Sequence, residues 1–243
     1  MIFSLFKSKP TLKELIPEGF IDIHSHILPG IDDGAKNINE SLELISELKE
    51  LGFNKIIGTP HIYEGVHNNT NEDIESSFNE LIKNDLKKIK VSYGAEYMLD
   101  MSIVKKASSN SLLCLKDSLV LVEMSYLSPP KLLFEILFEL AHNGYTPVLA
   151  HPERYRFYHG SFKNYEKLKR YGCQFQLNLF SITDYYGKDV KLVSDKLLSS
   201  GFIDYVGSDI HKIKQIENFK SKVTISSIND IEKIIENTIT VFN

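Results

Sequence analysis

The chain has 243 residues, a length that a single hydrophobic core can serve. Its composition, 42% hydrophobic and 25% charged, is ordinary for a globular protein. The formal net charge of −4 argues against nucleic acid as the main partner, because nucleic-acid-binding proteins usually carry a basic face. No stretch approaches the roughly 18 apolar residues of a membrane span, so we expect a cytoplasmic protein that does not cross a membrane.

The N-terminal segment is apolar and then basic. Its apolar run is too short for the hydrophobic region of a signal peptide, and no small-residue cleavage site follows it. We expect residues 1–19 to form an arm, either flexible or packed on the surface, ahead of a single domain at residues 20–243.

The two cysteines carry no recognisable chemistry. Cys114 and Cys173 stand in no CxxC pair, which argues against a disulfide framework and against a cysteine-rich zinc site. A phosphatase with a cysteine nucleophile needs an arginine six residues after the cysteine. Val120 and Leu179 occupy those positions, so this class is excluded.

Strand-like and helix-like segments alternate along the chain. The strand candidates are Phe20–His26, Lys55–Thr59, Val91–Glu96, Ser118–Glu123, Pro147–Ala150, Gln174–Leu179 and Tyr205–Ser208. The helix candidates are Ile38–Leu51, Glu72–Ile89, Leu132–Ala141, Phe162–Tyr171, Val190–Ser200 and Ile228–Thr240. This alternation is typical of parallel βαβ units and predicts an α/β barrel of about seven strands.

The first predicted strand ends in a pair of histidines. Alternate residues of a strand face the same side, so His24 and His26 can point at one spot, and Asp22 can orient His24 from behind. In the loop that follows, glycines flank Asp32 and Asp33 and allow a tight turn that aims a carboxylate back toward the histidines. The alternative for these two aspartates is a solvated turn.

Further ligand-type side chains follow the other predicted strands. They are His61, Glu96, Glu123, His151, Asp209 and His211. Active sites of α/β barrels lie at the carboxyl ends of their strands, so these groups should converge. Together with His24, His26 and Asp33 they are too many for one ion with four to six ligands, and we predict about two or three divalent ions. Imidazole and carboxylate ligands without thiolate suit manganese, iron or zinc.

Arg154, three residues after His151, can reach over such a cluster, and its planar fork matches two oxygens of a phosphoryl group. A surface salt bridge is the alternative. Aromatic residues crowd the same loops, which suits an aromatic substrate group or ordinary packing at the barrel rim.

These motifs, in this order, resemble the polymerase-and-histidinol-phosphatase (PHP) family. The opening DIHSHILPGIDDGAKNINESL is similar to that of the bacterial manganese-dependent protein-tyrosine phosphatases of capsule and exopolysaccharide systems. The resemblance implies a distorted seven-stranded, TIM-like (β/α)7 barrel that holds three metal ions. It implies Mn²⁺ as the metal and a phosphotyrosine protein as the substrate.

The resemblance also implies roles for individual residues. His24, His26, Asp209 and a bridging Glu96 would bind one ion, Glu96, Glu123 and His151 a second, and Asp33, His61 and His211 a third. Arg154 matches the substrate-binding, catalytic arginine of the family. Related phosphatases carry another arginine shortly after the last motif; this chain has Lys214 in that stretch, which could replace it as a point charge.

We therefore expect a metal-dependent phosphomonoester hydrolase that acts on protein phosphotyrosine. The resemblance suggests a membrane-anchored bacterial tyrosine kinase as the partner. A histidinol-phosphatase on the same metal cluster is the alternative. An amidohydrolase and a binding module with a dead site are rival classes, and the intact ligand set speaks against both. The oligomeric state cannot be read from the sequence.

Overall fold

The computed structural model describes residues 9–243. Its strands are β1 (Phe20–Ser25), β2 (Phe53–Gly58), β3 (His61–Ile62), β4 (Lys90–Tyr93), β5 (Glu96–Met98), β6 (Leu119–Glu123), β7 (Thr146–Ala150), β8 (Gln174–Asn178) and β9 (Tyr205–Gly207). They form two parallel sheets, one of three strands in the order β1-β2-β4 and one of six in the order β3-β5-β6-β7-β8-β9. A single bridge between Ser25 and Ile210 joins β1 to the chain just after β9.

The predicted α/β class with parallel strands is confirmed, whereas a closed seven-stranded barrel is not. One predicted strand, Val91–Glu96, is divided, and one short strand, β3, lies beyond the predicted strand Lys55–Thr59. Pro60 separates β2 from β3, because proline cannot donate a ladder hydrogen bond. Gly94 and Ala95 separate β4 from β5. Each break shifts the chain from the three-stranded sheet to the six-stranded one.

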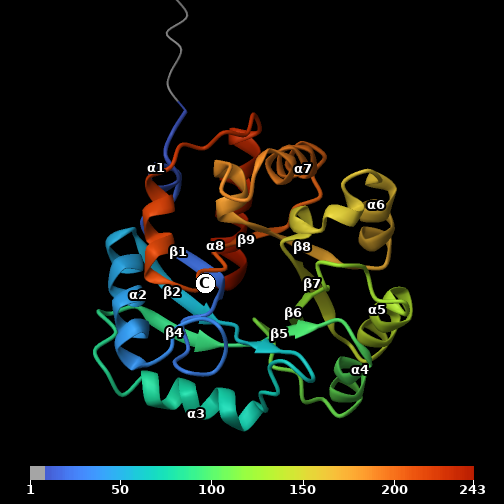
Figure 1. The fold of residues 1–243 in the computed structure, drawn as a ribbon, viewed down its shortest axis with the longest axis horizontal. Coiled ribbons are helices and arrows are strands. Elements are labelled where there is room, and N and C mark those ends of the chain that lie inside the picture. The colour runs from blue at the N-terminus through green and yellow to red at the C-terminus, as the bar shows by residue number, and fades with distance from the viewer. Residues whose placement is uncertain (1–8) are drawn as a thin grey trace, which may run out of the picture.

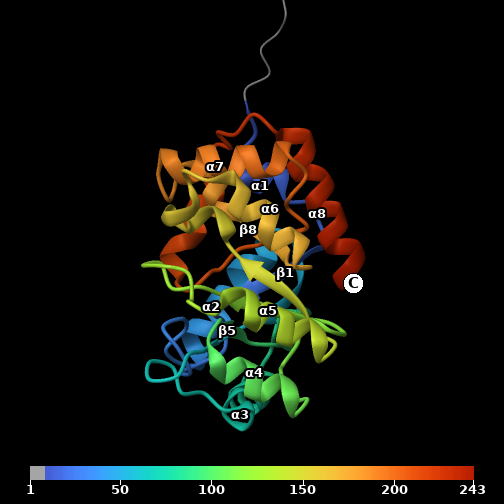
Figure 2. The same cartoon turned by 90° about the vertical axis from the view of Figure 1, so that its right-hand side faces the viewer.

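The helices lie around the outside of the strands (Figure 1). They are α1 (Leu12–Leu15), α2 (Ile38–Glu50), α3 (Asn71–Leu81), α4 (Met101–Ser108), α5 (Leu133–His142), α6 (Phe162–Arg170), α7 (Lys188–Ser199) and α8 (Ile228–Phe242), with the 3₁₀ segments η1 (Pro152–Arg154), η2 (Arg156–Tyr158), η3 (Leu179–Thr183) and η4 (Ile213–Lys220). Figure 2 shows α6, α7 and α8 toward one end of the molecule and α3 and α4 at the other.

The predicted helices are present, with one clear error of length. The helix expected over residues 72–89 ends at Leu81, eight residues early. Asn84 donates from its side chain back to the carbonyls of the last turn, and the Asp85 carboxylate accepts from the backbone N–H of Lys87, so a turn replaces the helix. The short helices α1 and α4 were not predicted from the sequence pattern.

The arm expected at residues 1–19 lies partly outside the described residues. The part that is described packs on the domain: Leu12 is fully buried, its backbone N–H donates to the Ser221 carbonyl, and Val223 donates to the Pro10 carbonyl. In the described part of the chain, no helix has the length and apolar character needed to cross a bilayer.

The strand β1 carries an irregularity next to its histidines. From Asp22 to Ser25 this strand advances three residues while β2 advances two, from Ile56 to Gly58. An extra residue of this kind bends a strand and re-aims its side chains. Gly207 on β9 allows the close approach, because a Cβ there would lie 2.7 Å from the Cβ of His24.

We predict that Asp195→Ala lowers the free energy of unfolding by about 1 kcal/mol, since it removes a charged acceptor at the start of a helix. The Asp195 carboxylate accepts from the backbone N–H groups of Ser226 and Ser227, which lead into α8, and from the Ser227 hydroxyl at 2.7 Å. Urea unfolding at neutral pH measures the loss, and Glu236→Ala, on the exposed face of α8, is the control.

The same contact predicts a pH dependence. Partial burial opposes ionisation of Asp195, but the hydrogen bonds from Ser227 and Ser226 hold its pKa below the ordinary value. Its contribution is therefore present above the unfolded pKa of about 4 and disappears as the pH falls through the lower folded pKa. A difference between wild type and Asp195→Ala that persisted well below pH 3 would contradict this assignment.

Candidate metal centre

The structure brings all nine predicted metal ligands together at the carboxyl ends of the strands. They form four overlapping groups whose ligand atoms lie within 4.8 Å of one another: His26, Asp33, His61 and His211; His24, His151 and Asp209; His24, His26 and Glu96; and His61, Glu96 and Glu123. The division differs from that implied by the resemblance in that His26 lies with Asp33, His61 and His211, His151 lies with His24 and Asp209, and Glu123 groups with His61 rather than with His151. Its Oε1 lies 3.0 Å from His61 Nδ1.

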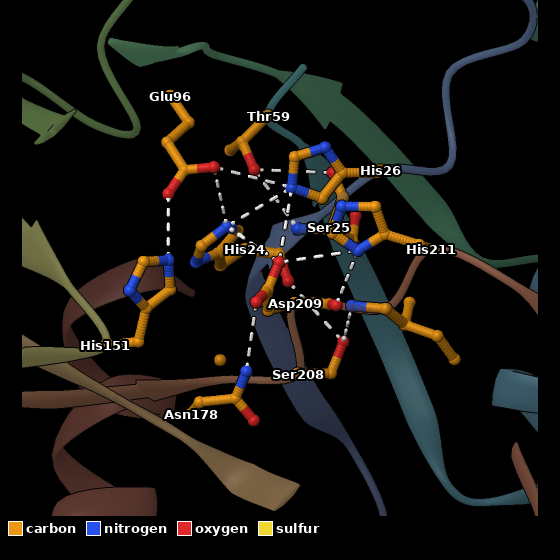
Figure 3. Close-up of polar contacts among 12 residues, drawn as sticks. His24, Ser25, His26, Thr59, Glu96, His151, Asn178, Ser208, Asp209 and His211 are labelled. Atoms are coloured by element: carbon orange, nitrogen blue, oxygen red, sulfur yellow. Dashed lines mark hydrogen bonds and ion pairs between the residues drawn. The ribbon is translucent and has the colours of Figure 1, made fainter. Parts of the chain in front are cut away.

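Glu96 contacts several histidines of the cluster, and dashed lines in Figure 3 connect its carboxylate with His24, His26 and His151. Its Oε2 is 3.2 Å from His24 Nε2 and 3.2 Å from His61 Nδ1, and its Oε1 is 3.3 Å from His151 Nε2. The side chain is fully buried. Within residues 9–243, neither carboxylate oxygen makes a contact with hydrogen-bond geometry.

This arrangement fits a divalent metal better than a hydrogen-bonded core. A buried carboxylate without hydrogen bonds is strongly unfavourable unless another group compensates for its charge. His61 Nδ1 is likewise buried without a hydrogen bond in the described part of the protein. Carboxylate oxygens and imidazole nitrogens that face one another at these distances form a set of donors that suits manganese, iron or zinc.

Two hydrogen bonds prepare the first histidine pair for such ligation. His24 Nδ1 lies 2.7 Å from Gln176 Oε1, and His26 Nδ1 lies 2.7 Å from Asp32 Oδ2. Both oxygens can only accept. The amide nitrogen of Gln176 donates to the Leu177 carbonyl, which identifies the other atom as the oxygen. The pKa of Asp32 lies at about 2, because the charge of His26 and hydrogen bonding to it outweigh the effect of burial. The ring protons therefore lie on Nδ1, which leaves both Nε2 atoms, 3.3 Å apart, free to bind a metal.

The turn expected at Asp32 and Asp33 does aim a carboxylate, that of Asp32, at the histidines, whereas the positioning role of Gln176 was not predicted. Gln176 stood inside a predicted strand as an unremarked polar residue, and a polar side chain in an apolar strand was the available signal. The expected role of Asp22 is wrong. Its carboxylate accepts from the backbone N–H of Ser208 at 2.9 Å and from the Ser208 hydroxyl. Asp22 therefore connects β1 with the residue that follows β9 and does not orient the His24 ring.

The two glutamates of the cluster have pKa values shifted in opposite directions. Burial opposes ionisation of Glu96, but the neighbouring imidazoles of His24 and His61 hold its pKa well below the ordinary value. Burial and the negative charge of Glu96 raise the pKa of Glu123. Burial and the nearby Arg154 cation lower the pKa of His151 to about 4, so its ring is neutral at pH 7, as a metal ligand must be.

The backbone is strained where two of the ligands leave their strands. His151 has φ +38° and Asp209 has φ +53°, in the left-handed region that side chains other than glycine, asparagine and aspartate rarely adopt. His151 also precedes Pro152, which disfavours helical backbone conformations. Strain of this kind persists only where surrounding contacts hold it, and it concentrates at functional sites.

Arg154 lies at the edge of the cluster. Its Nη1 donates to Asp209 Oδ2 at 2.6 Å, and its guanidinium lies over two rings, 4.3 Å from the centre of Tyr186 and 5.0 Å from that of Tyr126. Asn178 donates both to the Tyr186 hydroxyl and to Asp209 Oδ2, which ties these groups together. The partly buried arginine is thus held in place by its packing, and its salt bridge is with Asp209 of the cluster rather than on the open surface.

The remaining predicted residues differ in how they are placed. The Asp33 side chain is 58% exposed and its Oδ1 lies 3.3 Å from His211 Nε2, so it reaches the cluster from the solvent side. Lys214 is exposed on η4, and no hydrogen bond or ion pair in the described part of the structure connects it with the cluster.

Comparisons with known proteins agree with this geometry. The family model for capsular polysaccharide synthesis, CpsB/CapC, matches residues 20–231. The tyrosine-protein phosphatase YwqE of Bacillus subtilis is 31% identical over 198 residues, which cover 80% of this chain and 78% of the relative. The tyrosine-protein phosphatase CpsB of Streptococcus pneumoniae is 29% identical over 202 residues, covering 79% and 83%.

Solved structures extend the comparison. A chain from the crystal structures of YwqE from Bacillus subtilis and CpsB from Streptococcus pneumoniae, described as unique metal-dependent tyrosine phosphatases, superimposes with a TM-score of 0.76 at 28% identity. The match covers 90% of this chain and 95% of that one. An amidohydrolase from Mycoplasma synoviae, 14% identical with a TM-score of 0.51 over 97% and 86% of the two chains, shares the fold. The fold and the ligand cluster are those of a metal-dependent hydrolase, and the chain belongs to the CpsB/CapC family.

We predict that Glu96→Gln lowers the metal content from about two or three ions per chain to at most about one while leaving the fold intact. Glu96 belongs to two of the four ligand groups, and the amide removes its charge without changing its shape. Elemental analysis of the purified, metal-loaded protein gives the stoichiometry, and circular dichroism checks the fold. Glu217→Gln, an exposed change on η4, is the control. Unchanged metal content in Glu96→Gln would contradict a bridging role.

Proposed function

We propose that this chain is a metal-dependent protein-tyrosine phosphatase that acts in capsule or exopolysaccharide synthesis. The proposal depends on one observation: a partly buried arginine is held against a cluster of nine candidate metal ligands in a chain of the CpsB/CapC family. The relatives named tyrosine-protein phosphatases support the choice of reaction. In this proposal residues 20–243 form the phosphatase domain and the enzyme works in the cytoplasm.

The proposed ligands are His24, His26, Asp33, His61, Glu96, Glu123, His151, Asp209 and His211, which would hold two or three ions, with Mn²⁺ preferred and iron or zinc as alternatives. When bound, such ions lower the pKa of water and neutralise charge on the phosphoryl oxygens.

Arg154 binds and orients the phosphate ester in this proposal. Its guanidinium presents several N–H donors in a plane, and only one of them is engaged by Asp209. Donors fixed in a partly dry site stabilise charge that develops on the equatorial oxygens without having to reorganise. Because Tyr126 and Tyr186 hold the guanidinium, little side-chain entropy remains to be lost on substrate binding.

The leaving group suits the site. Hydrolysis breaks the bond between phosphorus and the phenolic oxygen of tyrosine, and water supplies the new oxygen. A phenol has a pKa of about 10, so it departs with less proton assistance than the alkoxide of serine. The proposed protein substrate is a phosphotyrosine protein, of which a membrane-anchored tyrosine kinase is the candidate partner.

The test is kcat/KM for a phosphotyrosine peptide, a matched phosphoserine peptide and histidinol phosphate, measured on one preparation of manganese-loaded enzyme. The proposal expects the phosphotyrosine peptide to be preferred. A clearly higher kcat/KM for histidinol phosphate would show instead that the enzyme is a histidinol-phosphatase, and only the proposed metal site would be retained.

We predict that Arg154→Ala lowers kcat/KM for the phosphotyrosine peptide about 100- to 1,000-fold, the usual loss for a preorganised electrostatic donor. Arg154→Lys recovers only part of this, because a lysine lacks the planar fork. Lys214→Ala, on an exposed segment, costs much less. If Arg154→Ala and Lys214→Ala each changed kcat/KM by the same small factor, Arg154 would not bind the phosphate ester in the reaction.

We also predict inactivation by chelators and resistance to iodoacetamide. Burial raises the pKa of the Cys114 thiol and raises that of Cys173 to about 12, so neither forms the reactive thiolate at neutral pH. Residual activity after prolonged dialysis against a chelator, and its recovery with Mn²⁺, are the measurements. Loss of activity with iodoacetamide but not with chelator would overturn the metal-dependent reaction.

A further inference from the structure

A cavity of about 240 Å³ opens directly beside the cluster. His61 and Glu123, two of the proposed ligands, form part of its lining. Much of the rest is apolar or aromatic, with Val66, Met98, Met124 and Tyr126 among the lining residues. Methionine side chains adapt well to aromatic rings, and their sulfur atoms make favourable contacts with ring edges.

One wall of the cavity is a tight hairpin. Tyr63 and His67 exchange two backbone hydrogen bonds of 2.9 and 2.8 Å, and Gly65 makes the turn with φ +84°. Asn68 accepts from the Gly65 backbone N–H, and the His67 ring stacks on His61 at 5.2 Å. The hairpin is therefore fixed to the cluster, and it places Val66, 61% exposed, at the cavity.

The opposite wall connects the cavity to the phosphate-binding arginine. The Tyr126 ring lines the cavity, stacks on the His151 ring at 5.7 Å and lies 5.0 Å from the Arg154 guanidinium carbon. A phosphoryl group between Arg154 and the cluster thus lies next to this cavity. In a phosphate ester of a phenol a single oxygen atom separates phosphorus from the ring, so the ring must lie within this short distance of the cluster.

We propose that this cavity binds the aromatic ring of the substrate and so selects aryl phosphates over alkyl phosphates. The proposal rests on the phosphatase function proposed above and names the part of the site that determines specificity. The ring displaces water from apolar walls, whereas the single methylene of phosphoserine leaves those walls wet. Among the described residues, Glu123 is the one carboxylate in the lining, and it already faces His61, so the cavity offers no separate acidic group to a cationic amine such as that of histidinol.

The test fills the cavity with a side chain of the protein. Phenyl phosphate and acetyl phosphate both have good leaving groups, but only the former carries a ring. The quantity measured is kcat/KM for phenyl phosphate divided by kcat/KM for acetyl phosphate. We expect Val66→Trp to lower this ratio about tenfold or more, because the pocket loses the space for the ring. Val66→Ala should lower the ratio by a smaller factor. Leu192→Trp, at a position of matched exposure on α7, is the control and should leave the ratio unchanged.

The outcomes separate this inference from the function on which it rests. If the manganese-loaded wild type hydrolyses neither ester above the rate without enzyme, the proposed phosphatase function fails. If the wild type hydrolyses both, and Val66→Trp changes the two kcat/KM values by the same factor or changes neither, the cavity is not the ring site and the inference is overturned. Circular dichroism of the variants shows that the fold is retained in each comparison.

Discussion

The burial of Glu96 among imidazoles is the constraint on which the site depends. A carboxylate removed from water and given no hydrogen bond destabilises a fold by several kcal/mol unless opposite charge compensates for it. Here both oxygens face histidine nitrogens at 3.2 to 3.5 Å, contributed by β1, β3 and the ends of other strands. Protonated histidines supply the compensating charge in the protein alone; divalent ions would supply more of it and release those protons.

The surrounding structure holds the ligands in the geometry that this charge requires. Gln176 and Asp32 fix the ring protons of the first two histidines, and Asp22 joins β1 to the end of β9. Left-handed backbone at His151 and Asp209 turns each side chain into the cluster as its strand ends. Arg154 lies in the loop that follows His151 and donates to Asp209, so the proposed metal and phosphate sites share one support.

The convergence of the nine candidate ligands was predictable because they lie at or near the ends of short apolar strands or in the loops that follow, and parallel strands end at one edge of a sheet. The α/β class was predictable from the same alternation. The role of Gln176 was not predictable, since it depends on which ring nitrogen of His24 its amide oxygen approaches in the folded chain. For Asp32 the turn was predicted, but its particular partner, His26 Nδ1, was not. The sequence pattern also could not show that the chain changes sheets at Pro60, between β2 and β3, and at Gly94, between β4 and β5. Nor could it show that a hairpin brings Val66 beside His61, because such features depend on contacts made in the folded chain.

Diffraction at a manganese absorption edge, from crystals of the metal-loaded protein, tests the central claim most directly. We expect about two or three anomalous peaks, at least one of them within about 2.0 to 2.3 Å of a Glu96 carboxylate oxygen. The absence of any peak at Glu96, with its carboxylate instead hydrogen-bonded to protonated histidines in a fully active enzyme, would contradict it.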